Sequence, residues 1–165
     1  MTFKWIFLLA FAALSTKAQL HNPNSINKFI FTQLTFHEGN CNGSCPSFSI
    51  NINRDMKVEI SRTIYKKKGV VDIKKSGNFI GQLNKNVFNN FLNLIRAINW
   101  DTLTMPKVYC CDAGIKIFNI SYNNRKARFI SMFPPKCTSD LLVFLRSLAT
   151  SPNFERIKQD IYFQN

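Results

Sequence analysis

Histidine and glycine are scarce in this chain, and their scarcity limits the chemistry that it can carry out. Its 165 residues include two histidines and six glycines. The glycines are scattered, so they do not form the glycine-rich loop that cradles a phosphate. His37 lies near Cys41 in the sequence, but no third residue is indicated that would orient such a pair for nucleophilic catalysis. The composition therefore favours a protein that is not an enzyme, with His37 as a polar residue at a strand end.

Long apolar runs are also scarce. The run at residues 5–14 is ten residues long, whereas a helix needs about 20 to span a bilayer. Lys4 precedes it and small residues follow as far as Ala18, which is the order of a cleavable secretory signal. We therefore expect residues 1–18 to be removed after Ala18. The mature chain, residues 19–165, is then a single exported domain, periplasmic or extracellular, with no transmembrane segment.

Acidic residues are few, nine against 22 basic ones, and the formal net charge is +13. The basic residues are densest in two clusters, which are Lys66, Lys67, Lys68, Lys74 and Lys75 in the first and Arg125, Lys126 and Arg128 in the second. Such a surface attracts polyanions by a Coulomb force that salt screens. For an exported protein we expect anionic envelope polymers or lipid headgroups, and no nucleic acid, because no nucleic-acid-binding motif accompanies the lysines. A solvated surface without a specific partner is the alternative.

The first half of the mature chain reads as strands followed by a helix. Alternating and β-branched residues predict a strand over residues 29–37 and an antiparallel hairpin over residues 48–64. Residues 69–73 could add another strand. From Asn84, a candidate N-cap, apolar residues recur at helical spacing as far as Ile98, which predicts the longest helix.

The second half repeats this order. Strands are predicted over residues 114–122 and 125–133, joined by an Asn-Asn turn that tolerates positive φ. A helix over residues 140–149, capped by Ser139, follows, and a last short helix is predicted from Ser151. We therefore predict an α+β fold, in which two hairpins and an N-terminal strand form an antiparallel sheet with helices packed on one face.

Five cysteines carry the most informative chemistry, and they are Cys41, Cys45, Cys110, Cys111 and Cys137. In an oxidising compartment such residues form disulfides, and an odd number leaves at least one unpaired. Cys110 and Cys137 are equally far from the turn of the second hairpin, so its register would place them opposite each other. Two prolines can disturb that register. We therefore predict that Cys137 bonds either Cys110 or Cys111.

The segment at residues 41–46 has the pattern C-x-G-x-C-P. A disulfide between Cys41 and Cys45 is the structural interpretation, with Gly43 allowing a tight loop and Pro46 fixing the entry to the next strand. A redox-active thiol pair is a second interpretation, although C-x-x-x-C is one residue longer than the usual redox spacing. Zinc binding is a third, and we expect neither a metal nor a cofactor.

This motif, followed by Phe48, a hairpin, a long helix and Asp112 before a second hairpin, resembles a family of uncharacterised exported bacterial domains, classified as a domain of unknown function. The resemblance covers about residues 28–149. It implies an envelope location and a compact α+β fold, and it implies no activity. We therefore expect a non-enzymatic envelope module that binds an anionic surface, a glycan or a peptide through its basic face. The alternative is a thiol-based redox enzyme or redox partner that uses Cys41 and Cys45.

Overall fold

The computed structural model describes residues 29–41, 44–108, 110 and 112–163, and its main feature is a seven-stranded sheet in the order β8-β7-β1-β2-β3-β6-β9. Neighbouring strands of this sheet run antiparallel. In chain order they are β1 (Phe31–Glu38), β2 (Ser47–Asn53), β3 (Lys57–Thr63), β6 (Gly77–Gln82), β7 (Lys116–Tyr122), β8 (Arg125–Ser131) and β9 (Glu155–Ile157). The leader predicted at residues 1–18 lies outside the described residues.

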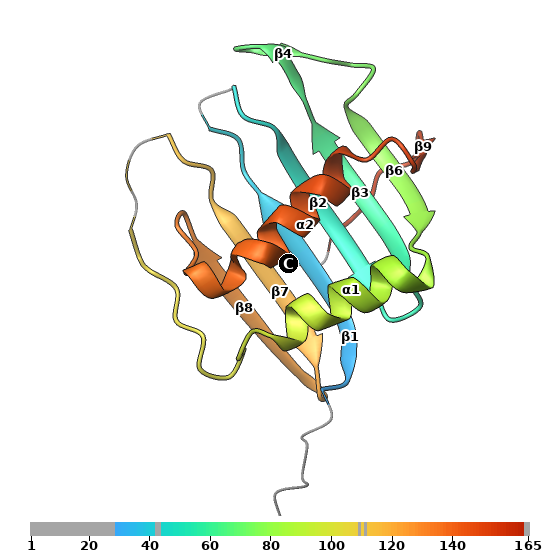
Figure 1. Cartoon of the computed structure of the whole chain (residues 1–165). Coiled ribbons are helices and arrows are strands. Elements are labelled where there is room, and N and C mark those ends of the chain that lie inside the picture. Colours follow the sequence, from blue (N-terminus) through green and yellow to red (C-terminus); the bar gives the residue numbers. More distant parts are fainter. Residues whose placement is uncertain (1–28, 42–43, 109, 111, 164–165) are drawn as a thin grey trace, which may run out of the picture.

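The helices of the described chain lie on one face of this sheet (Figure 1). They are α1 (Lys85–Arg96), the short 3-10 helix η1 (Lys136–Thr138) and α2 (Ser139–Thr150). A separate two-stranded hairpin, made of β4 (Tyr65–Lys67) and β5 (Val70–Val71), lies beyond the end of the main sheet (Figure 1). The predicted α+β class is confirmed in outline. Within the described residues, no helix is long and apolar enough to cross a membrane.

The two faces of the sheet differ in polarity because side chains alternate along each strand. The face under the helices is apolar, and its fully buried residues pack with helix residues into a core that includes Leu34, Phe36, Ile50, Ile52, Ile60, Phe91, Ile95, Phe118 and Leu145. We call the other one the open face. By the strand registers it carries Gln33, Thr35, His37, Ser49, Asn51, Glu59, Asn119, Ser121, Lys126 and Arg128.

The first predicted hairpin and the longest predicted helix are both present. β2 and β3 pair antiparallel across a turn in which Met56 has a φ of +66°, a conformation that glycine adopts more readily. α1 begins after Asn84, whose side-chain oxygen accepts a hydrogen bond of 2.9 Å from the Val87 amide. This confirms the predicted N-cap. The strand expected over residues 69–73 is limited to the two residues of β5.

The second hairpin is confirmed in the register that its turn predicts. Asn123 and Asn124 have φ values of +46° and +59°, as a two-residue hairpin turn requires. β7 and β8 stay in register as far as Lys116 opposite Ser131, where the ladder ends.

The last helix predicted from Ser151 is wrong, because this segment contains β9, which pairs with β6. The ring of Phe154 lies over Gly81 of β6, so that a Cβ on this glycine would meet the ring at 2.5 Å. The strands β6 and β9 extend the sheet beyond the two hairpins and the N-terminal strand that the sequence predicts. Contacts with the sheet edge thus override a local pattern that resembles a helix start.

The ends of α2 also differ from the prediction. Thr138 is its N-cap residue, and Ser139 is already helical. At the other end Arg62 reaches up from β3, and its Nη1 donates to the carbonyls of Ala149 (2.6 Å) and Ser151 (3.0 Å). A buried arginine therefore satisfies carbonyl groups that a helix C-terminus leaves without intrahelical partners.

Candidate functional site

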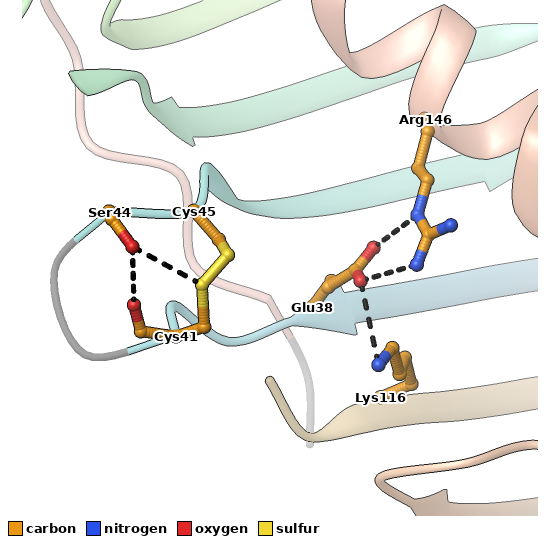
Figure 2. The surroundings of a disulfide bond; sticks show 6 residues. All are labelled: Glu38, Cys41, Ser44, Cys45, Lys116 and Arg146. Carbon is orange, nitrogen blue, oxygen red and sulfur yellow. Dashed lines mark hydrogen bonds and ion pairs between the residues drawn. A yellow bond between two sulfur atoms is a disulfide. The ribbon is translucent and has the colours of Figure 1, made fainter. Parts of the chain in front are cut away.

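Cys41 and Cys45 form a disulfide that closes the loop between β1 and β2 (Figure 2). Their Cα atoms are 5.1 Å apart, within the usual range for a disulfide. The Ser44 amide donates to the Cys41 carbonyl (3.0 Å), and the Ser44 hydroxyl lies 3.7 Å from the Cys41 sulfur. Pro46 leads into β2, while Gly43 lies outside the described residues. This geometry fits the structural interpretation of the motif.

A charged cluster lies beside this loop, at the end of β1 (Figure 2). The Glu38 carboxylate accepts two hydrogen bonds from Arg146 of α2, from Nε (2.9 Å) and Nη2 (2.7 Å). Lys116 Nζ lies 3.7 Å from the same carboxylate and donates to the Met132 carbonyl (2.9 Å). Hydrogen bonding to Glu38 raises the pKa of Arg146. The cluster joins α2 to the sheet, and its charged groups bind one another within the fold.

The remaining cysteines do not meet in the hairpin ladder. The expected position of Cys110 opposite Cys137 is wrong, because pairing stops at Ser131 and the chain then turns through two prolines into η1, where Cys137 lies. Cys110 and Cys137 are both exposed. The predicted bond from Cys137 to Cys110 or Cys111 is wrong as well, because Cys137 is a free cysteine in the structure; Cys111 lies outside the described residues. In the part of the chain that the structure describes, no group of three or more histidine, cysteine, aspartate or glutamate residues could hold a metal ion.

The open face carries a chain of hydrogen bonds across three neighbouring strands. Gln33 Nε2 on β1 donates to Asn51 Oδ1 on β2 (2.7 Å), and Asn51 Nδ2 donates to Glu59 Oε2 on β3 (2.9 Å). Lys57 Nζ completes it with a bond of 2.8 Å to the second oxygen of Glu59. These bonds hold the amide and carboxylate groups in fixed positions on the face.

A shallow pocket of about 240 Å³ lies on the open face next to this chain, over β1, β7 and β8. The polar residues that line it are Gln33, Thr35, Asn119, Ser121, Lys126 and Arg128. Thr35 is 7% exposed, so the floor is largely shielded from water. Within the described residues, neither Lys126 nor Arg128 forms an ion pair. The pocket therefore presents hydrogen-bonding groups beside two cations without counterions.

The fold divides the two basic clusters seen in the sequence. Alternation along β8 places Lys126 and Arg128 on the open face and Arg125 on the opposite side, where its Nη1 lies 3.2 Å from Asp101 Oδ1. The Tyr122 hydroxyl donates to the same oxygen (2.8 Å). Burial and this hydrogen bond raise the pKa of Tyr122. The five lysines of the other cluster are exposed on and beside the β4–β5 hairpin.

Comparison with protein families gives a match over this region. The model of a family described as a domain of unknown function, DUF6438, matches residues 32–137, more than half of the chain. The chain belongs to the DUF6438 family. The matched range begins in β1 and ends in η1, so it contains both the disulfide loop and the open-face pocket. A search of curated proteins found no match.

The protein has a second hollow on the open face, formed partly by its C-terminal segment, which lies outside the matched range. Phe163 lines it together with Thr35, His37, Ser49 and Arg128, and the segment after β9 runs behind the sheet in this view (Figure 1). His37 Nδ1 forms a hydrogen bond of 2.9 Å with the Ser49 hydroxyl. Burial lowers the pKa of His37, and the charge of the neighbouring Glu38 opposes this only in part.

The lowered pKa of His37 predicts a pH-dependent stability of the DUF6438 domain. As the pH falls below the ordinary histidine value of 6.5, the unfolded state takes up the proton first, so the free energy of unfolding decreases. We expect this loss between pH 7 and pH 5 to be smaller in His37→Gln. Urea unfolding of both proteins across this range measures the difference. If the free energy of unfolding changed with pH in the same way in both proteins, His37 would not be the source of the pH dependence.

The sequence pointed to the cysteine loop and to the lysine-rich segments but not to the open-face pocket of the DUF6438 domain. The pocket residues come from three strands, and Gln33 and Lys126 are 93 positions apart in the chain. Alternation within each strand was the available signal, but it does not say which strands are neighbours. The order β8-β7-β1 brings these residues together.

Proposed function

We propose that this DUF6438 protein is an exported, non-enzymatic module that binds an anionic polysaccharide of the cell envelope on the open face of its sheet. The observation that carries the proposal is the pair of cations, Lys126 and Arg128, at a pocket lined by amide and hydroxyl groups. Carboxylated or sulfated sugars need both kinds of partner, since cations bind the acidic groups and amides bind the hydroxyls.

The charges around the pocket favour an anion over a neutral ligand. Glu59, the carboxylate of the neighbouring hydrogen-bond chain, is already bonded to Lys57 and Asn51. Burial raises the pKa of Glu59, but these hydrogen bonds outweigh it and the net pKa is lowered, so the group stays an occupied acceptor. Lys126 and Arg128 have no comparable partner among the described residues, and a guanidinium can hold a carboxylate through two parallel hydrogen bonds.

Export is part of the proposal and is supported by the leader-like sequence and by the disulfide between Cys41 and Cys45. Structural disulfides persist outside the reducing cytosol. Thiol exchange by the same pair is the alternative, and it would need a sulfur activated by a nearby cation or helix N-terminus. The Cys41 sulfur contacts the neutral Ser44 hydroxyl. The nearby cations, Arg146 and Lys116, form ion pairs with Glu38. These contacts favour a structural disulfide and a binding function.

We expect the double variant Lys126→Gln/Arg128→Gln to bind polygalacturonate at least about tenfold more weakly than the wild-type protein, since each charged hydrogen bond contributes about 1.5–3 kcal/mol. Affinity electrophoresis or calorimetry with this polymer at low ionic strength measures the effect. Binding should weaken as salt is added, because the attraction is partly long-range.

A matched control variant removes the same number of positive charges from the other side of the molecule. Lys85→Gln/Arg96→Gln removes one exposed lysine and one exposed arginine from α1 and should leave the affinity nearly unchanged. Equal losses in the two double variants would mean that only net charge matters. That result, or equally tight binding to uncharged dextran, would refute the proposed site.

A further inference from the structure

Apolar side chains are exposed together on the β4–β5 hairpin and the turn that follows it. Val70 is 41% exposed, Val71 is 40% exposed and Ile73 is 75% exposed. Single exposed apolar residues are common on protein surfaces, but a group of them on a projecting element marks a contact site. Gly69 in the hairpin turn has a φ of +73°, and a Cβ placed there would meet nothing within 4 Å. The tip of the hairpin is therefore open to a partner.

The same element carries the densest positive charge of the chain. Lys66, Lys67, Lys68, Lys74 and Lys75 are all exposed, and no ion pair joins any of them to a described residue. The single acidic residue among them is Asp72, whose Oδ1 accepts a hydrogen bond from the Lys74 amide (3.1 Å). The lysines thus flank the exposed valines and isoleucine. This combination suits a partner whose outer layer is negatively charged and whose interior is apolar.

The position of the hairpin lets it meet a broad flat surface. It follows β3 and precedes β6, so it lies at the same end of the sheet as the disulfide loop (Figure 1). β7 begins and β8 ends at this end too, and the adjoining residues Ile115 and Phe133 are 40% and 43% exposed. The end of the sheet that carries the lysines therefore also exposes apolar side chains from several other segments.

We propose that this end of the protein docks on a bilayer containing anionic lipids, with Ile73 entering the headgroup region and the hairpin lysines contacting phosphate groups. Lysines near an anionic membrane and apolar groups buried at its boundary both contribute to binding. A polysaccharide would attract the lysines but would give the exposed valines and isoleucine no apolar medium to enter. The hairpin residues are separate from the open-face pocket, so this inference is independent of the polysaccharide proposal.

Sedimentation with lipid vesicles tests the docking. Protein purified after expression of the full chain should bind phosphatidylcholine vesicles that contain phosphatidylglycerol, and bind vesicles of phosphatidylcholine alone much more weakly. Lys66→Gln/Lys67→Gln should lower the partition coefficient about tenfold or more, and Ile73→Gln should lower it by about tenfold, chiefly in the part that survives added salt. A tryptophan introduced by Ile73→Trp should shift its emission to shorter wavelength on the anionic vesicles.

Matched variants separate this site from net charge and from general hydrophobicity. Lys85→Gln/Arg96→Gln and Val143→Gln, which alters a 64% exposed valine on α2, should bind the vesicles like the wild type. Lys126→Gln/Arg128→Gln should also keep vesicle binding, while Lys66→Gln/Lys67→Gln keeps polygalacturonate binding. Absence of vesicle binding at low salt, equal losses in the control variants, or an unshifted emission would overturn the proposal.

Discussion

Glu38→Gln is expected to lower the free energy of unfolding by about 3–5 kcal/mol, because removing one partner of a buried ion pair leaves the other charge uncompensated. The side chains of Glu38 and Lys116 are only 12% and 10% exposed. Glutamine keeps the size of the side chain but cannot neutralise Lys116, and it can no longer accept both charged hydrogen bonds from Arg146. Urea unfolding followed by circular dichroism measures the loss.

The same substitution at Glu59 is the matched control for this prediction. Glu59 also pairs with a lysine, but Lys57 is 55% exposed, and an exposed pair contributes at most about 1 kcal/mol. Adding Lys116→Met to Glu38→Gln should restore part of the stability, since it removes the unpaired charge. A loss below about 1 kcal/mol in Glu38→Gln would show that the cluster does not stabilise the fold.

Arg62→Met is expected to lower the free energy of unfolding by about 2–4 kcal/mol, since charged hydrogen bonds contribute about 1.5–3 kcal/mol each. Arg62 is 8% exposed. It bonds the carbonyls at the end of α2, its Nε donates to the Lys75 carbonyl (2.8 Å), and its guanidinium lies 4.0 Å from the centre of the Phe79 ring. Methionine fills similar space but leaves those carbonyls without their donor.

Two further variants make the Arg62 prediction specific. Arg62→Lys keeps the charge but not the forked donors, so its loss should lie between those of the wild type and Arg62→Met. Arg54→Met removes a side chain that is 74% exposed and should change stability by no more than about 0.5 kcal/mol. Thermal unfolding of the wild type and the three variants gives the order of their stabilities. Equal stability of Arg62→Met and Arg54→Met would exclude a role for Arg62 in holding α2.

Local patterns predicted the elements that depend on neighbouring residues. The Asn-Asn turn gave the register of the second hairpin, and Asn84 gave the start of α1, because turn conformations and caps are determined within a few residues. Alternation also separated the core side of β2 from its open side. In each case the decisive contacts lie close together in the chain.

Elements that depend on distant contacts were not predictable in the same way. β6 contains Gly77 and Gly81, which weaken the strand signal, and β9 forms only because β6 offers it an edge. The open-face pocket likewise exists because β7 lies between β8 and β1. The sequence of a single strand does not indicate which strands lie beside it in the sheet. The candidate site could therefore be found only once the sheet topology was known.

The position of β8 at the border of the sheet has a consequence for self-association. A border strand exposes backbone groups that can pair with another copy, and positive side chains discourage this because two such strands repel each other. β8 carries Arg125, Lys126 and Arg128 within seven residues. A polyanion that neutralised them would also remove the repulsion, so crowded copies on one polymer would lose their protection against strand-to-strand aggregation.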